Sequence, residues 1–485
     1  MLFNSYGYLF FFPIVFFIYW MIKPEKFRIQ NILLIVASYI FYACWDYRFL
    51  FLLIFSTSLD YFTGLKIFQS QSKRQKKIWL FVSLIINLGI LGFFKYYNFF
   101  IESFSDLLMF LGFQPNIWTL KIILPVGISF YTFHGLSYVL DIYNEKIKPT
   151  RNVIDYSLFV SFFPLLVAGP IERATHLLPQ LQRPKYFNRS TAVDGLKQIL
   201  WGLLKKIVIA DNCAVIVDQV FSNHETMPAH ALILGAIFFT FQIYGDFSGY
   251  SDIALGSARL LGIELLRNFN YPYFSRDIAE FWRRWHISLT TWFKDYLYIP
   301  LGGSRGSTWM SVRNTFIVFL LSGFWHGANW TFIFWGVIHV LYFLPLLLTK
   351  SNRKNVVSVA FGRKVPTSKE FFQMGLTFVL VAFAWIFFRA ENISQAFSYI
   401  SNVFSPSFFS FDIGNYQIGG RSKVLMTLLL IIAFVCVEWL GREKQYAIAD
   451  LGIKKKWKRY ALYYSILIII LLLGEEGQQF IYFQF

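Results

Sequence analysis

Long apolar runs, separated by short polar stretches, recur from one end of the chain to the other. The first of these runs cover residues 6–22, 29–45 and 49–65. Each is close to the length of about 20 residues that an α-helix needs to cross the hydrocarbon core of a bilayer. This pattern predicts a polytopic membrane protein rather than a soluble domain with a single anchor.

Further runs of the same kind cover residues 78–97, 120–140, 193–217, 229–255, 312–325, 328–348, 371–388, 424–440 and 460–474. Lysine and arginine gather in alternate loops between the runs, at 23–28, 66–77, 146–151, 350–369 and 441–459. The positive-inside rule places these loops in the cytoplasm. The chain is therefore expected to have about twelve crossings, with both termini outside.

Three stretches depart from the simple pattern. Pro125 and Gly127 interrupt the run 120–140, which predicts a kinked or broken helix. The run 154–170 contains two prolines and has basic residues on both flanks, so we expect a re-entrant hairpin buried in protein. Residues 262–306 mix arginine and lysine with tryptophan, as interfacial helices do. The predicted fold class is all-α, with transmembrane, re-entrant and interfacial helices in one integral-membrane domain over residues 1–485.

Composition supports a membrane protein and argues against a nucleic-acid partner. Of the 485 residues, 56% are hydrophobic and only 15% are charged, whereas a soluble domain usually carries about 25% charged residues. The net charge of +18 resides in the loops between apolar runs, as the positive-inside rule expects. Single, scattered cysteines and the absence of a P-loop or a Gly-x-Ser-x-Gly elbow give no metal or nucleotide signature.

His326 is the first candidate for chemistry. It lies in the stretch S-G-F-W-H-G-A-N-W-T-F-I-F-W-G, residues 322–336, between two apolar runs. An ionisable group at membrane depth is costly and is therefore a functional-site candidate. The alternative is a histidine that only hydrogen-bonds to a neighbouring helix. Gly323, Gly327 and Gly336 allow the backbones on either side to approach closely.

His286 is the second candidate, in the stretch F-W-R-R-W-H-I-S-L-T-T-W-F-K-D-Y-L-Y-I-P-L-G-G-S, residues 281–304. The predicted topology reaches His286 from the cytoplasmic face and His326 from the outer face. Both imidazoles then approach the membrane interior, as transfer across a membrane requires. A neutral imidazole can take a proton from a hydroxyl group as that hydroxyl attacks a thioester. The other histidines are expected to have structural roles: His134, His176, His224, His230 and His339.

Several polar residues near the two histidines are candidates for substrate binding. Cationic and aromatic side chains near the inner face suit a phosphate-bearing donor, although positive-inside charge explains them equally well. Asn329 is placed to orient His326. Asp246 in Y-G-D-F-S-G-Y is expected to be paired or hydrogen-bonded, in helix packing or along a tunnel. The donor-binding set is Trp282, Arg283, Arg284, Lys294 and Asp295.

Five ordered motifs resemble the membrane-bound O-acyltransferase superfamily, in the bacterial branch that acetylates exported polysaccharides such as alginate. Two are the stretches around His286 and His326. The others are P-V-G-I-S-F-Y-T-F from Pro125, F-F-P-L-L-V-A-G-P-I-E-R from Phe162 and Y-G-D-F-S-G-Y-S-D-I-A-L-G from Tyr244. The resemblance covers nearly the whole chain. It implies a catalytic core at about residues 120–348, with further helices over 371–485.

The resemblance assigns roles that the residues alone do not. His326 would be the principal catalytic residue, acting as base or acyl relay, and His286 would assist or shape the pocket. The aromatic ending F-I-Y-F-Q-F resembles the C-terminal ending of this branch, so Tyr482 would relay the acyl group. The alternative for Tyr482 is an anchor at the membrane interface.

The expected function is transfer of an acyl group, most simply acetyl from acetyl-CoA, to a hydroxyl group outside the cytoplasm. No bound cofactor is expected. The resemblance implies a bacterial inner-membrane enzyme, a polysaccharide acceptor and an extracytoplasmic partner acetyltransferase of the serine-hydrolase (SGNH) type. One alternative is D-alanyl transfer to teichoic acid from a carrier protein. The alternative from another class is a transporter that flips a lipid or polymer.

Overall fold

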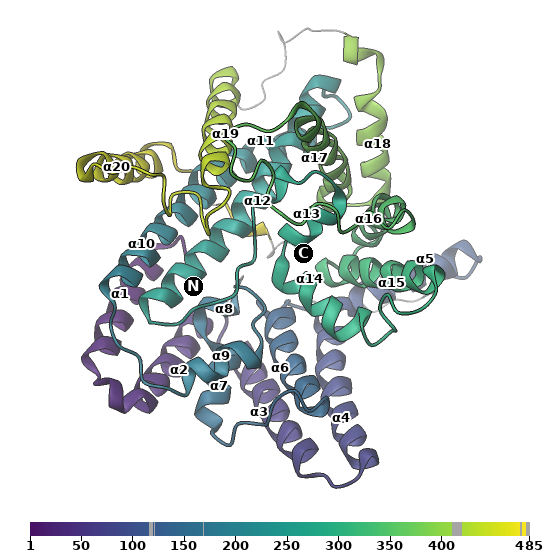
Figure 1. Ribbon diagram of the computed structural model, residues 1–485. Helices are drawn as coiled ribbons and strands as arrows, with labels where there is room; N and C mark the ends of the chain where they lie inside the picture. The colour runs from purple at the N-terminus through teal and green to yellow at the C-terminus, as the bar shows by residue number, and fades with distance from the viewer. Residues whose placement is uncertain (116–119, 121, 168, 410–419, 476–477, 482–485) are drawn as a thin grey trace. The chain divides into compact units, whose positions relative to one another are not determined.

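The computed structural model describes residues 1–115, 120, 122–167, 169–409, 420–475 and 478–481 (Figure 1). All regular elements in these ranges are helices, as the apolar pattern predicts. The chain divides into two compact units. Unit 1 comprises Met1–Ala192 and Ala258–Leu266, and unit 2 comprises Val193–Ser257 and Arg267–Phe485. The predicted single domain with a core at about 120–348 stays a prediction.

Unit 1 is a group of helices in which α3, α4 and α6 pack against one another and α2 packs against α7 (Figure 1). Serine caps start two of them: Ser5 accepts a hydrogen bond from Tyr8 N–H, and Ser72 accepts one from Gln75 N–H. The helices are α1 (Tyr6–Met21), α2 (Phe27–Ala43), α3 (Arg48–Gln69), α4 (Lys73–Leu91), α5 (Tyr97–Phe110), α6 (Ile128–Tyr143), α7 (Val153–Ser161), α8 (Phe163–Leu166) and α9 (Ala174–Leu181).

Two helices run through the sequence boundaries of the units, α10 (Arg189–Leu203) and α12 (Ala229–Leu260). The remaining helices belong to unit 2, where α15 packs on α16 and α16 on α17. They are α11 (Asp211–Ser222), α13 (Ile278–Arg284), α14 (Ile287–Phe293), α15 (Thr308–His326), α16 (Trp330–Leu348), α17 (Ser368–Arg389), α18 (Ile393–Val403), α19 (Arg421–Gly441) and α20 (Lys456–Leu473).

Short irregular helical turns join or interrupt these elements. Single π-helical turns cover Gly92–Tyr96, Leu204–Ala210 and Lys294–Tyr298, and 3-10 turns cover Pro24–Lys26, Pro272–Phe274 and Pro406–Phe409. The π-turn Gly92–Tyr96 joins α4 and α5 into one helical stretch, Lys73–Phe110. Turns of this kind inside helices often occur near functional sites.

The membrane-spanning character of the chain is confirmed by its helices. Those long and apolar enough to cross a bilayer are α3, the α4–α5 stretch, α12, α16, α17 and α19. The chain also bends by 112° between α1 and the stretch Pro24–Ala43, and the two parts together meet the same criterion. The total of about twelve crossings stays a prediction.

α12 is the most buried of the long apolar helices in the described residues. In its apolar window 83% of the residues are buried, against 22–44% in the other long apolar helices, so protein rather than lipid surrounds it. Glycines permit this packing. A side chain on Gly202 of α10 would lie 2.6 Å from the carbonyl oxygen of Gly249 on α12. Small residues of this kind let membrane helices approach closely.

The interrupted stretches of the sequence fold as irregular or short elements. The interruption predicted at Pro125 and Gly127 in the run 120–140 is present: in the described residues 122–127 the chain is not helical, and α6 begins at Ile128 after Gly127, whose φ is +73°. The stretch 154–170 forms the short buried helices α7 and α8, and its re-entrant path stays a prediction. Short helices also form within 262–306, as expected.

Candidate active site

His326 is the last residue of α15, and its position depends on a tight hairpin between α15 and α16. A side chain on Gly323 would clash with the backbone of Phe332, and one on Gly336 would lie 2.6 Å from the carbonyl oxygen of Phe319. The two helices are therefore in close contact, as the glycines predict. The His326 side chain is only 2% exposed, because aromatic rings enclose it.

These rings define the environment of His326. The indole of Trp325 lies 5.0 Å away between ring centroids, that of Trp335 lies 5.2 Å away, and the ring of Phe388 on α17 lies 5.3 Å away. All three meet the imidazole edge to face, an arrangement that aromatic pairs prefer. The site thus holds the imidazole in an apolar pocket closed by rings from three helices.

His286 lies at the junction of α13 and α14. Its φ of +43° is in the left-handed region, which non-glycine residues seldom adopt. Hydrogen bonds on either side hold this conformation: Ile287 N–H donates to the carbonyl of Asn268 at 2.9 Å, and Thr290 N–H donates to the carbonyl of His286 at 3.0 Å. Such strained residues persist where the surroundings fix them, commonly at functional sites.

The two histidines lie next to each other inside unit 2. Their ring centroids are 6.4 Å apart, with an angle of 60° between the ring planes. The indole of Trp325 lies 5.8 Å from His286 and 5.0 Å from His326 and therefore contacts both rings. The expected proximity of the two imidazoles is present in the structure, whereas their access from opposite membrane faces stays a prediction.

Asn268 is the hydrogen-bond partner of His286, and sequence reasoning missed it. Its Oδ1 lies 3.1 Å from His286 Nδ1 and accepts hydrogen bonds from the amide and hydroxyl of Ser288. Its Nδ2 donates to the hydroxyl of Ser251 on α12 at 3.3 Å. Asn268 is in an irregular segment with no helical periodicity, so the contact depends on a fold that no local pattern reveals.

His339 adds a third imidazole to the aromatic cluster. Trp282 Nε1–H donates to His339 Nδ1 at 3.3 Å, and the ring centroids lie 4.9 Å apart. Trp335 lies 4.8 Å from His339 and 5.2 Å from His326. A continuous set of rings thus connects Trp282 to His326. The structural role predicted for His339 agrees with this packing.

A cavity of about 210 Å³ borders this set of rings. Its wall combines apolar side chains with cationic ones, among them Lys294 and Arg353. Ser322 also lines it and precedes His326 by about one helical turn on α15. The sequence predicted Trp282 and Lys294 as binding residues. It did not single out Arg353, because Arg353 is one of several basic residues in the same loop.

The other predicted donor-binding residues have different partners. Arg283 donates to the carbonyls of Asn352 at 2.7 Å and Asn355 at 2.8 Å. Arg284 forms an ion pair with the buried Glu280 at 2.8 Å. Asp295 forms a longer pair with Lys294 at 3.5 Å. Arg283 therefore attaches α13 to the loop after α16, and Arg284 bonds to the first turn of α13. Neither residue lines the cavity of about 210 Å³.

The side chain of Asn329 caps the start of α16 and does not orient the ring of His326 as predicted. Its Oδ1 accepts from Thr331 N–H at 3.0 Å, and its Nδ2 donates to the carbonyl of Glu391 at 2.7 Å. An asparagine at this position satisfies backbone groups that a helix start leaves unpaired. The side chain thereby fixes the turn after His326 and joins it to the segment after α17.

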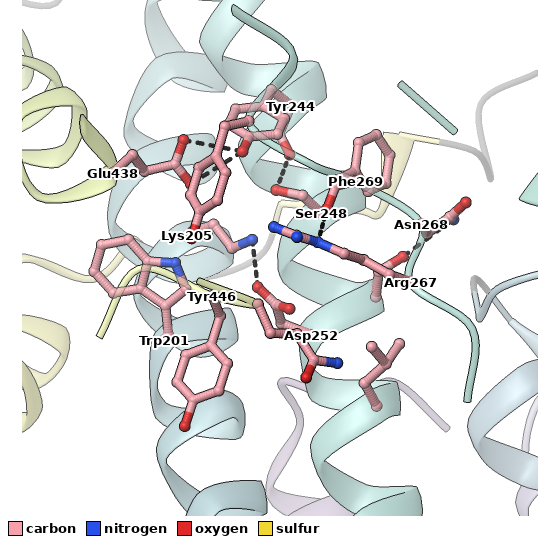
Figure 2. Close-up of a pocket in the computed structure, with 14 residues that line it drawn as sticks. Trp201, Lys205, Tyr244, Ser248, Asp252, Arg267, Asn268, Phe269, Glu438 and Tyr446 are labelled. Atoms are coloured by element: carbon pink, nitrogen blue, oxygen red, sulfur yellow. Dashed lines mark hydrogen bonds and ion pairs between the residues drawn. The ribbon is translucent and has the colours of Figure 1, made fainter. Parts of the chain in front are cut away.

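A second, polar cavity of about 20 Å³ lies beside Asn268 (Figure 2). Lys205 and Asp252 form an ion pair across it at 2.5 Å, and the Tyr244 hydroxyl donates to Glu438 at 2.9 Å. Ser251 and Asn268 are also in its wall. A polar cavity of this volume has room for about one water molecule. Lys205 therefore lines a polar cavity.

The predicted pairing of Asp246 is also confirmed. Lys206 Nζ lies 2.8 Å from Asp246 and 2.7 Å from Asp211, and Ile481 N–H donates to Asp246 at 2.6 Å. Phe480 and Ile481 are fully buried, with 0% and 1% exposure. The described end of the chain therefore packs inside unit 2 instead of forming an exposed tail. Tyr482 lies outside the described residues, so both of its predicted roles stay predictions.

Comparison with known proteins identifies the family. The model of the membrane-bound O-acyltransferase family matches residues 144–383. A probable alginate O-acetylase of Pseudomonas aeruginosa is 38% identical over 455 residues, which are 92% of this chain and 82% of the relative. A peptidoglycan O-acetyltransferase of Helicobacter pylori is 37% identical over 425 residues, 82% of this chain and 78% of the relative.

A teichoic acid D-alanyltransferase of Bacillus subtilis is more distant, at 29% identity over 243 residues, 47% of this chain and 60% of the relative. The long apolar helices and the family match together confirm a multi-pass membrane protein, which in bacteria resides in the inner membrane. The acetylating relatives match over most of their length at well above 30% identity. The chain therefore belongs to the membrane-bound O-acyltransferase family and is an enzyme that transfers acyl groups to hydroxyl oxygens.

Proposed function

We propose that this enzyme takes an acetyl group from acetyl-CoA in the cytoplasm and passes it to a hydroxyl group outside. The acceptor is an exported polysaccharide or a partner acetyltransferase of the serine-hydrolase (SGNH) type. The observation that carries the proposal is the distance of 6.4 Å between the rings of His286 and His326. Two adjacent buried imidazoles, connected by aromatic rings to a cavity with cationic side chains in its wall, suit base-assisted transfer from a phosphate-bearing donor.

The cavity of about 210 Å³ is the proposed donor site. Lys294 and Arg353 suit the phosphate groups of CoA, since an ammonium or a guanidinium pairs with phosphate oxygens. Phe293 and Phe319 in the same wall give apolar contact for the thioester arm. Ser322, one turn before His326, marks the part of the wall nearest to that histidine along α15.

The chemistry requires two proton transfers and one bond exchange. His326 acts as a base and takes the proton of the acceptor hydroxyl. The hydroxyl oxygen forms a bond with the acyl carbon, the C–S bond of the thioester breaks, and the thiolate of CoA leaves. The imidazolium then returns the proton to the thiolate, so no further reactant is needed. The aromatic pocket excludes water, which would otherwise hydrolyse the thioester.

Acetyl transfer is favoured over D-alanyl transfer by the extent of similarity. The acetylating relatives match 82–100% of this chain, whereas the D-alanyl relatives match 44–47%. The names of the acetylating relatives further support a polysaccharide acceptor, either an alginate-like polymer or a peptidoglycan glycan strand.

The test compares His326→Ala with wild type in cells that lack the native gene. Surface polysaccharide is isolated, and acetate released by mild alkali is measured per mole of sugar. We expect His326→Ala to lose ester acetate while the amount of exported polymer is unchanged. His230→Ala serves as the matched control. Full acetylation with His326→Ala would refute the proposal, and loss of polymer with normal acetate per sugar would favour a transporter.

A further inference from the structure

We infer that Asn268 is a positioning residue that fixes the imidazole of His286 in the tautomer protonated on Nδ1. The expected effect of Asn268 on turnover rests on the proposed function, whereas the tautomer of His286 does not depend on it. The side chain of Asn268 is 1% exposed and lies between His286, Ser288 and Ser251. Its contacts determine which of its two ends faces the histidine.

The first step is the orientation of the Asn268 amide. The backbone N–H of Ser288 lies 3.3 Å from the amide atom that faces His286. A backbone N–H can only donate, so that atom is the carbonyl oxygen Oδ1. The other end of the amide meets Ser251 Oγ at 3.3 Å, and a hydroxyl oxygen accepts from the NH₂ group. The Ser288 contact assigns the orientation, and the Ser251 contact is compatible with it, because a hydroxyl can donate as well as accept.

The second step is the tautomer of His286. Its Nδ1 lies 3.1 Å from Asn268 Oδ1, which has no hydrogen to donate. A hydrogen bond at this distance therefore requires the proton on Nδ1. In the neutral imidazole the lone pair then resides on Nε2, at the other side of the ring. The hydrogen bond of one ring nitrogen sets the function of the other.

The third step is the backbone. Asn268 also accepts from Ile287 N–H through its own carbonyl oxygen at 2.9 Å, and Asn270 N–H donates to the carbonyl of Arg284 at 2.9 Å. The segment around Asn268 thus runs beside the junction of α13 and α14. Asn268 holds both the ring of His286, whose own φ is +43°, and the backbone N–H of the residue after it. One residue therefore fixes the ring orientation and the strained backbone together.

For the reaction, this tautomer makes His286 a hydrogen-bond acceptor at Nε2. An acceptor at Nε2 can take a hydrogen bond from a hydroxyl group of the substrate, whereas an Nε2–H could only donate. His286 then complements His326, 6.4 Å away between ring centroids, by accepting a hydrogen bond from a neighbouring hydroxyl of the polysaccharide while His326 deprotonates the attacking one. Partners that orient metal-bound histidines typically change activity by about 10- to 100-fold, and we expect an effect of similar size for His286.

The test uses the full-length protein in membrane vesicles and measures the CoA thiol released at a series of acetyl-CoA concentrations. Asn268→Leu removes the acceptor with little change in volume, whereas Asn268→Asp keeps an oxygen facing Nδ1. We expect Asn268→Leu to lower kcat by about 10- to 100-fold with KM for acetyl-CoA unchanged. Asn268→Asp should restore most of the turnover. Asn212→Leu, which removes a buried asparagine bonded to Val208 and Leu473, is the matched control.

A spectroscopic signature separates positioning from folding. The ¹⁵N signals of ¹⁵N-histidine-labelled protein distinguish protonated from unprotonated ring nitrogens, and the His286 signals are assigned by their loss in His286→Gln. Wild type should show Nδ1 protonated, and Asn268→Leu should lose that preference. An Nε2–H tautomer in wild type, or an unchanged tautomer in Asn268→Leu, would overturn the inference. Active His326→Ala would instead refute the proposed function and leave the tautomer result standing.

Discussion

The indole N–H of Trp282 donates to Nδ1 of His339 at 3.3 Å, and this pair lies between the proposed donor cavity and His326. Trp282 lines the cavity, and Trp335 contacts both His339 and His326. An acyl chain that extends from the cavity toward His326 meets these rings. The aromatic set is therefore suited to a short acyl group.

Trp282→Ala is expected to widen acyl selectivity. Removing the indole opens space for additional methylene groups, and each buried methylene contributes about 0.8 kcal/mol. The ratio of kcat/KM for butyryl-CoA to that for acetyl-CoA should rise by about tenfold. Rates of CoA thiol release with the two donors measure the ratio. Trp309→Ala, on the exposed start of α15, is the control, and an unchanged ratio in Trp282→Ala would show that other residues limit chain length.

Lys294→Ala and Arg353→Ala are expected to raise KM for acetyl-CoA without changing kcat. Both cations line the cavity but are not part of the histidine pair. A hydrogen bond to a charged group contributes about 1.5–3 kcal/mol, so each variant should raise KM by about tenfold or more. Steady-state rates in membrane vesicles measure both parameters.

Arg283→Ala is the informative contrast to these two variants. Its guanidinium bonds the carbonyls of Asn352 and Asn355, so its loss should lower thermal stability while KM changes little. If Arg283→Ala raised KM as much as Lys294→Ala, the donor phosphates would contact α13 rather than the cavity wall, and the original sequence prediction for Arg283 would be restored.

The pair of His176 and Glu172 in unit 1 is expected to make stability depend on pH. The hydrogen bond and charge of Glu172, 2.8 Å away, raise the pKa of His176 above its ordinary value of 6.5. A raised folded-state pKa gives stabilisation that is fully present below the unfolded-state value and is lost as pH rises through the folded-state value. The effect is modest, because 36% of the His176 side chain is exposed and solvent screens the pair.

Thermal unfolding in detergent from pH 5.5 to pH 8.5 measures this dependence. The Tm of the wild-type protein should fall as pH rises above about 6.5. His176→Gln should remove that part of the slope, and His230→Gln should retain it. Identical slopes in wild type and His176→Gln would show that the ion pair does not contribute to stability.

Much of the helical fold follows from the sequence, because long apolar runs have few alternative structures in a membrane. The run 371–388 corresponds to α17, Ser368–Arg389, and the run 424–440 corresponds to α19, Arg421–Gly441. Backbone groups in lipid must be hydrogen-bonded within their own segment, so an apolar run of this length forms a helix. Helix α18, Ile393–Val403, was missed because it is short and amphipathic within a polar loop.

The candidate site was only partly predictable. His326 and His286 stand out because ionisable groups are rare in apolar surroundings. The contact between Asn268 and His286 joins an irregular segment to a strained helix junction, and no local periodicity encodes it. Arg283 and Arg284 show the same limit: the sequence gives their charge, but their partners depend on how the loop after α16 folds back on α13.

Lys206 is expected to hold Phe480 and Ile481 in unit 2 through a buried ion cluster. Its ammonium contacts Asp211 at 2.7 Å and Asp246 at 2.8 Å, and Asp246 accepts the N–H of Ile481. Lys206→Met leaves two buried carboxylates without their cation, which should cost about 3–5 kcal/mol of stability. Thermal unfolding in detergent measures the loss, with Lys197→Met as the control.

The same cluster predicts a rescue. Replacing all three charges in Lys206→Met, Asp211→Asn and Asp246→Asn removes the unpaired carboxylates, so most of the lost Tm should return. The Asp246→Asn change keeps an oxygen for the Ile481 N–H, and the buried Phe480 keeps its contact with Tyr250 at 4.3 Å between ring centroids. A triple variant as unstable as Lys206→Met would mean that Lys206 acts through packing rather than charge. The rate at which a protease removes a C-terminal tag would then report whether Phe480 and Ile481 still pack inside unit 2.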